Sequence, residues 1–256
     1  MLRAALTVIA TCMALPATAL CTGDSYLTQL APEQRADIDA AVAATPHANG
    51  LVWTLTRDAK TLTVVGTMHV YDARLEPIRD RVLPALRTAD LMMVEATSEE
   101  ETAMQEAFIA APDLYLITEG PTLPDLLDPA VWDKVLEAAG DRGLPGFLVA
   151  KMQPWYLSLT LGIPACAMAE LAAGKRGLDH MLITEAAASD VPLQALEGWE
   201  TLIAVLTDGT QEEQIAMLKL GLIDAADQQA LFVAMLDAYF SEKIAAVWEI
   251  SQIAAS

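Results

Sequence analysis

Of the three histidines in the 256-residue chain, His69 has the surroundings best suited to chemistry. It follows the β-branched run "TLTVVG" and lies three residues after Gly66, where a strand would give way to a loop. An imidazole there can exchange protons near neutral pH or bind a metal through a ring nitrogen. Gly66, which has no Cβ, would permit a close backbone approach or an unusual turn. A hydrogen-bonded residue at a strand end explains a single G-x-x-H spacing equally well.

Two glutamates end other strand-like runs. Glu95 ends "LMMVE", and one helical segment (73–89) separates it from the His69 strand. A strand–helix–strand unit makes its two strands parallel, and we expect them to be adjacent, with their carboxyl ends at one ligand-binding edge. His69 and Glu95 could there share a metal ion or act as acid and base. Glu197, at the end of "VPLQALE", is a further candidate for that edge, whereas Glu95 could instead be a neighbour of a helix N-cap.

A second literal G-x-x-H occurs in "GLDH", where Asp179 is a plausible N-cap of a helix over 177–188. The preceding "LAAGKR" is not typical of a strand, and the histidine falls just inside the helix. We therefore interpret His180 as a variable helix position rather than as part of a site.

The elements around these residues predict an α/β fold with α+β character. The runs 51–56 and 61–66 indicate a hairpin with Asp58 in its turn, and 91–96 and 191–196 indicate further strands. These strands would form a small mixed sheet covered by many helices. The C-terminal half is rich in helical pattern, and nothing marks a linker. The apolar segment 154–173 is interrupted by Gly162 and Pro164, which favours a buried helical hairpin over a membrane span.

The N-terminus predicts export. Residues 1–19 combine Arg3, an apolar stretch and an A-x-A sequence at 17–19, which is typical of a signal peptide. The mature domain, 20–256, would then be periplasmic or secreted. It would keep Cys21 and Cys166, which in an oxidising compartment can form a disulfide, although two unrelated thiols are the alternative.

Charge and motifs exclude several function classes. The formal net charge is −20, so nucleic acid and anionic membranes are poor partners because phosphate binding needs clustered Lys and Arg. The chain contains no G-x-S-x-G, H-E-x-x-H, P-loop or dinucleotide fingerprint.

Three segments together resemble the TraB/GumN family, which is similar to the Tiki metalloproteases. They are "GLVWTLTRDAKTLTVVGTMHVYDAR", "ADLMMVEA" and "GLDHMLITEAAASDVPLQALEGWETL". The resemblance implies a fold related to the erythromycin-esterase and ChaN group, a divalent metal (Mn, Co or Zn) and a peptide or protein substrate. It makes Gly66 and His69 the first G-x-x-H and Glu95 the strand-end glutamate, so that His69 and Glu95 become catalytic and metal-ligating candidates. Asp179 and Glu197 fall in later segments of the family pattern.

One departure from the family pattern leaves two functions open. The family's second G-x-x-H follows an apolar strand near the C-terminus, whereas this sequence ends in "AAVWEISQIAAS", which has a helical pattern. The first hypothesis is an exported metal-dependent hydrolase, peptidase-like, in a truncated or inactive form if the second motif is lost. The alternative is a non-catalytic periplasmic binding or scaffold protein that holds a metal or haem.

Overall fold

The structure is a computed structural model, and it describes residues 21–254. The predicted signal peptide lies outside the described residues. Helices hold 59% of the described residues, and the strands form two small sheets, which confirms the predicted α/β class with a helix-rich C-terminal half. The strands are β1 (Val52–Arg57), β2 (Lys60–Val65), β3 (Met92–Val94) and β4 (Leu193–Ala195).

The helices are unevenly distributed around these strands. Those before residue 123 are η1 (Tyr26–Thr28), α1 (Pro32–Ala44), α2 (Leu75–Leu86), α3 (Ser98–Ala110) and η2 (Pro112–Leu114). The middle of the chain forms α4 (Leu123–Leu126), α5 (Pro129–Gly140), α6 (Gly146–Val149), α7 (Pro154–Gly162), η3 (Ala165–Ala167), α8 (Met168–Ala172) and α9 (Leu178–Ala188). After β4 come α10 (Trp199–Thr207), α11 (Gln211–Leu220), α12 (Ala225–Phe240) and α13 (Ile244–Ala254).

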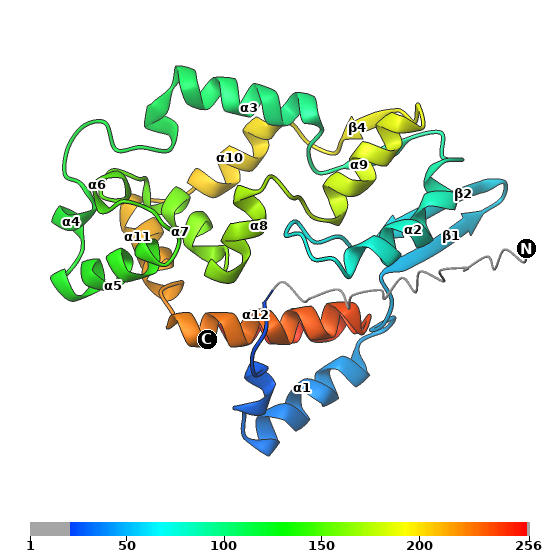
Figure 1. Cartoon of the computed structure of the whole chain (residues 1–256), viewed down its shortest axis with the longest axis horizontal. Helices are drawn as coiled ribbons and strands as arrows, with labels where there is room; N and C mark the ends of the chain where they lie inside the picture. The colour runs from blue at the N-terminus through cyan, green and yellow to red at the C-terminus, as the bar shows by residue number, and fades with distance from the viewer. Residues whose placement is uncertain (1–20, 255–256) are drawn as a thin grey trace, which may run out of the picture.

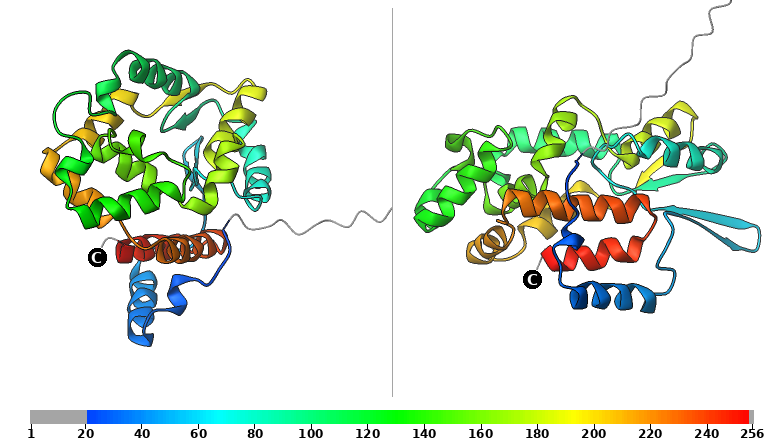
Figure 2. Two further views of the ribbon diagram at one scale, coloured as in Figure 1. Left: turned by 60° about the vertical axis from the view of Figure 1, so that its left-hand side comes forward. Right: turned by 60° about the horizontal axis from the view of Figure 1, so that its bottom comes forward.

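The molecule has a strand-containing end and an all-helical end. Figure 1 shows β1, β2, α2 and α9 at one end and α4–α7 with α11 at the other, while α12 runs along one side and α3 with α10 along the opposite side. α13 packs between α12 and α1, as the second view of Figure 2 shows. Each end has its own core, one around Leu123, Val135 and Leu157 and the other around Leu75 and Leu178.

The hairpin forms as predicted. β1 and β2 pair antiparallel from Val52–Val65 to Arg57–Lys60, which leaves a two-residue turn. Asp58 occupies that turn with φ of 54°, a left-handed conformation that Asp tolerates better than most residues. The hairpin projects from the body of the molecule (Figure 2).

The expected adjacency of the His69 and Glu95 strands is wrong. β3 pairs in parallel with β4, Val94 opposite Ala195, and forms a sheet separate from the hairpin. The reason lies in the backbone after β2. The Gly66 carbonyl accepts a hydrogen bond from the Tyr239 hydroxyl (2.9 Å), and the Met68 carbonyl accepts one from the Leu178 N–H (2.8 Å). The chain after β2 is thus bonded to α12 and α9, whereas β3 is bonded to the β4 segment, with the Met92 N–H donating to the Pro192 carbonyl (2.9 Å).

A disulfide joins the start of the described chain to its middle. Cys21 and Cys166 are bonded, with their Cα atoms 5.6 Å apart, which confirms the predicted pair. They pack with Leu236 and Met68, so the bond lies beside the loop that carries His69.

The apolar segment 154–173 divides into short helices. In the part of the chain that the structure describes, no single helix is long and apolar enough to cross a membrane, and only a pair bent by 73°, Pro154–Gly162 with Ala165–Ala172, meets that test together.

Candidate functional site

His69 lies in the loop between β2 and α2, and its side chain is 72% exposed. The loop is held from two sides. The Gly66 N–H donates to the Leu51 carbonyl (2.8 Å), and the Gly66 carbonyl is bound by Tyr239 of α12. The backbone of the loop is therefore fixed while the imidazole is accessible.

The start of α9 packs against the backbone of this loop. The Gly177 N–H donates to the His69 carbonyl (3.0 Å), next to the bond from Leu178 to Met68. A Cβ on Gly177 would lie 1.8 Å from the Met68 oxygen and 2.6 Å from the His69 Cα, so only glycine fits there.

The close backbone approach expected at Gly66 is not found there. A Cβ on Gly66 would be 3.6 Å from the nearest Leu51 side-chain atom, an ordinary contact, so the backbone there does not require a glycine. The close approach is made by Gly177 instead.

Asp179 links the loop to α9 through its side chain. It is buried, with 8% exposed, and its Oδ2 lies 2.9 Å from His69 Nδ1. Gly177, rather than Asp179, is the N-cap of α9, which corrects the expected cap. Asp179 is instead the second helical residue, and a carboxylate there also suits the positive end of the helix dipole.

The ionisation of the pair follows from this geometry. Burial opposes a charge on Asp179, but hydrogen bonds from His69 and His180 outweigh that cost and lower its pKa to about 2. The hydrogen bond to Asp179 raises the pKa of His69, burial opposes that rise, and the charges of Asp179, Glu95 and Glu101 reinforce it. Near neutral pH, Asp179 is an anion beside a readily protonated imidazole.

His180 joins the same carboxylate, which the sequence interpretation missed. Its Nδ1 lies 3.0 Å from Asp179 Oδ2, and its Nε2 lies 2.9 Å from Glu101 Oε1 on α3. Its position inside the helix is as expected. The available signal was the Asp-His dipeptide in "GLDH", whereas nothing in the sequence connects Glu101 to it.

Glu95 and Glu197 follow the paired parallel strands β3 and β4 and are both exposed. Glu95 is close enough for its charge to raise the pKa of His69. Within residues 21–252, neither carboxylate forms a hydrogen bond or an ion pair. The structure thus brings His69 and Asp179 into direct contact, places Glu95 near them, and gives Glu197 no contact with either.

The donor set does not complete a metal site. Among the residues that the structure describes, no group of three or more His, Cys, Asp or Glu side chains could hold a metal ion. A catalytic zinc normally has three protein ligands. His69 and Glu95 alone fall short of that number.

Comparison with known families identifies the chain. The TraB/PrgY/gumN family matches residues 51–256, which include His69, Glu95 and the Gly177–His180 segment. The chain belongs to the TraB/PrgY/gumN family. This confirms the family to which the sequence was compared. No curated protein matches the chain, and no solved structure matches it.

For this TraB/PrgY/gumN protein, the matched region contains every described residue of the candidate site. Gly177 and Asp179, from the "GLD" segment of the family resemblance, are the residues that hold His69 by backbone and by side chain. Two of the segments that carried the resemblance therefore meet in space.

Proposed function

We propose that this protein is an exported hydrolase, peptidase-like in its substrate, and that the His69 imidazole is its reacting group. One observation carries the proposal: His69 Nδ1 is bonded to a buried carboxylate while the side chain is open to solvent. Such a pair is the arrangement by which a carboxylate orients a catalytic histidine.

The hydrogen-bond pattern assigns the proton. Asp179 is ionised and can only accept, so His69 Nδ1 carries the hydrogen and donates it. In the neutral ring, Nε2 then has a free lone pair that can take a proton from water as the water attacks a substrate carbonyl. Asp179 stabilises the imidazolium that forms, and the charge of Glu95 adds to this effect.

The proposal has a second form, the metal form, in which His69 binds the divalent metal (Mn, Co or Zn) that the family resemblance implies. A carboxylate bonded to Nδ1 also orients histidines that bind metals through Nε2. Since His69 and Glu95 do not reach three ligands, we derive no step through a metal, and the experiment below tests for one directly.

Two features support export. The predicted signal peptide supplies the route, and the Cys21–Cys166 bond is of a kind that persists in oxidising compartments. We therefore propose a periplasmic or secreted location.

The test compares two histidine variants of the chain from residue 20 onward. Hydrolysis of a mixture of unstructured peptides is measured with chelator and with added Mn, Co or Zn. We expect His69→Gln to lower the rate by at least about 100-fold, as removal of a general base does. His47→Gln is the matched control, because His47 lies in an exposed loop. Equal rates in the two variants would refute the role of His69, and dependence on one metal with chelator-sensitive activity would favour the metal form.

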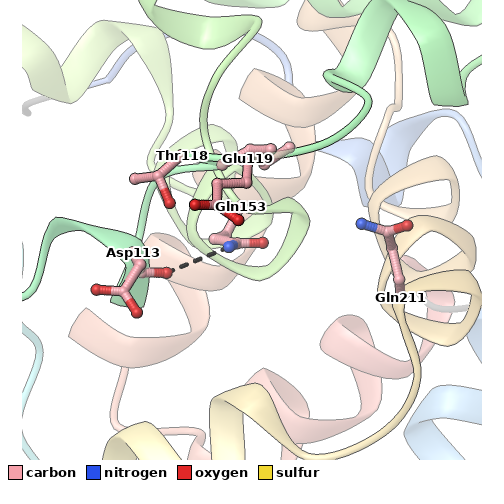
Figure 3. Close-up of a pocket in the computed structure, with 6 residues that line it drawn as sticks. Asp113, Thr118, Glu119, Gln153 and Gln211 are labelled. Atoms are coloured by element: carbon pink, nitrogen blue, oxygen red, sulfur yellow. Dashed lines mark hydrogen bonds between the residues drawn. The ribbon is translucent and has the colours of Figure 1, made fainter.

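The second candidate is a binding module, and one observation favours it. A cavity of about 410 Å³ lies at the all-helical end, away from His69, lined by Asp113, Ile117, Thr118, Glu119, Gln153 and Gln211. Figure 3 shows the polar side chains of this lining around an open space, with Gln153 held by a hydrogen bond to the Asp113 carbonyl (3.2 Å). This lining suits a small polar ligand better than haem, which needs an apolar slot. Binding of small polar molecules that Glu119→Gln weakens, with no peptide hydrolysis by the parent protein, would favour this candidate.

A further inference from the structure

Both ring nitrogens of His180 face carboxylate oxygens. Nδ1 is 3.0 Å from Asp179 Oδ2, and Nε2 is 2.9 Å from Glu101 Oε1. A neutral imidazole has one N–H and one lone pair, so it can satisfy only one of two ionised carboxylates. A bare Nε2 would point its lone pair at the negative oxygen of Glu101. The geometry is satisfied when both nitrogens carry hydrogen.

We propose that His180 is a positioning residue: as an imidazolium bridging Glu101 and Asp179, it fixes the carboxylate that orients His69. This inference rests on the proposed function for its catalytic meaning, but the proton state and the bridge stand on geometry alone. The bridge also connects the first turn of α3 to the first turn of α9, because Glu101 and His180 lie in those turns.

Asp179 depends on this bridge because its other oxygen is not held. Oδ1 is buried and has no hydrogen-bond partner among the described residues, so only the two bonds to Oδ2 fix the carboxylate. One of these bonds comes from His69, which is 72% exposed, and the other comes from His180, which is 29% exposed. The more enclosed bond is the one that can stay in place while His69 exchanges protons.

Helix electrostatics explain why two carboxylates are needed. His180 is the third residue of α9, where the positive end of the helix dipole disfavours a cation. Asp179 and Glu101 offset that field from two directions. Glu101 is itself held on a fixed element, since the neighbouring Glu100 accepts a hydrogen bond from the Trp199 N–H (2.9 Å) and so ties α3 to α10.

The first measurement is nitrogen NMR of protein labelled at histidine. The chain has only three histidines, so single substitutions assign the ring signals. From the two contacts we expect both nitrogens of His180 to carry hydrogen in the parent protein. In Glu101→Gln, the amide can donate to a bare Nε2, so His180 should become neutral. Glu99→Gln is the matched control, because it removes the same charge from the same turn at an exposed position. A neutral His180 in the parent protein, or identical spectra in the two variants, would overturn the inference.

The second measurement asks whether the bridge acts on His69. His180→Leu removes both donors, whereas His180→Asn keeps an N–H near the Nδ1 position. We expect the His69 Nδ1–H signal to be lost or shifted in His180→Leu and retained in His180→Asn. If the parent protein hydrolyses peptides, kcat should fall about ten-fold in His180→Leu with KM unchanged, as for other residues that orient a catalytic group.

The two proposals fail in different ways. A parent protein without hydrolytic activity, with the NMR results as expected, would remove the hydrolase and keep the bridge. An active parent in which His180→Leu leaves both kcat and the His69 signal unchanged would keep the hydrolase and overturn the positioning role. Should His180→Leu not fold, Glu101→Gln and its control still decide the question.

Discussion

The two G-x-x-H segments have the same spacing but opposite properties. In the first, Gly66 has ordinary space for a side chain and His69 is open to solvent. In the second, Gly177 has no space for a Cβ and His180 is bonded at both ring nitrogens. The segments also touch, because the Gly177 N–H donates to the His69 carbonyl.

This difference shows that the two segments are not equivalent halves of one site. The second segment supports the first by its backbone, through Gly177, and by its side chain, through Asp179. A motif read by spacing alone does not reveal whether the glycine or the histidine is the constrained member. In the first segment the histidine matters, because His69 is accessible to solvent. In the second segment the glycine matters, because a side chain at Gly177 would clash with the loop.

Removal of the disulfide should have the largest effect on stability. Its cysteines are separated by 145 positions, and cross-linking a loop of that size stabilises a fold by about 4–5 kcal/mol in the chain-entropy model. Since Met68 packs in the same apolar cluster as the two cysteines, the first segment should loosen before the second. Urea unfolding of the double variant Cys21→Ser/Cys166→Ser measures the total, and hydrogen exchange separates the segments. If amide protons in both G-x-x-H segments lost protection from exchange to the same extent, the expected difference between the segments would be contradicted.

Substitution of the two glycines tests the difference between the segments most directly. Gly177→Ala forces the loop and α9 apart, so we expect a loss of about 3 kcal/mol, the upper range for overpacking. Gly66→Ala should change the free energy of unfolding by less than about 1 kcal/mol, since the new methyl group fits. Both are measured by urea denaturation, and a larger effect at position 66 would reverse the assignment.

Acid should act through Asp179. The pKa of this carboxyl is lowered from 3.8 to about 2 in the folded protein, so its contribution is present above pH 3.8 and is lost as the pH falls towards 2. The shift corresponds to about 2 kcal/mol. In Asp179→Asn, the free energy of unfolding should be lower near neutral pH and should fall less steeply in that acid range. An acid limb as steep as that of the parent protein would show that other carboxylates control it.

The smallest effect on stability should come from substitution of His69. Its pKa is raised from 6.5 in the folded state, chiefly by the hydrogen bond to Asp179, so its contribution is complete below 6.5 and is lost as the pH rises through the raised value. His69→Gln should weaken this alkaline decline, whereas His47→Gln should leave it unchanged. Thermal midpoints measured across neutral pH test this, and an unchanged profile in His69→Gln would place the decline elsewhere.

Local pattern was sufficient to predict the strands and the pairing within the hairpin, but not the pairing of strands that are distant in the sequence. The hairpin was placed within one residue because β-branched runs flank a turn sequence, and β3 and β4 were recognised as short apolar runs. β3 instead pairs with β4, about 100 positions later in the chain, and the backbone just after β2 is bonded to α9 and α12. Such contacts between distant segments leave no signal in the spacing of residues 60–95.

The sequence predicted a site residue only where a reactive side chain ended a strand-like run or fell in a segment of the family pattern. His69 and Glu95 stood out because each ends an apolar run, and Asp179 entered through the family resemblance. His180 was set aside because helix position alone carries no information about a partner on another helix. Glu101 lies in the acidic run "SEEE", where the sequence does not distinguish a solvated carboxylate from a bridging one.

The bond between His69 and Asp179 also has a consequence for folding. These residues are 110 positions apart, and β3 pairs with β4 across a similar span, Met92 with Leu193. Loops of this length must close before such contacts stabilise anything, which slows folding relative to proteins built from local contacts. A chain that emerges N-terminus first would carry His69 without its carboxylate until α9 has followed. The paired His69 and Asp179 would therefore form only after the long loop between them has closed.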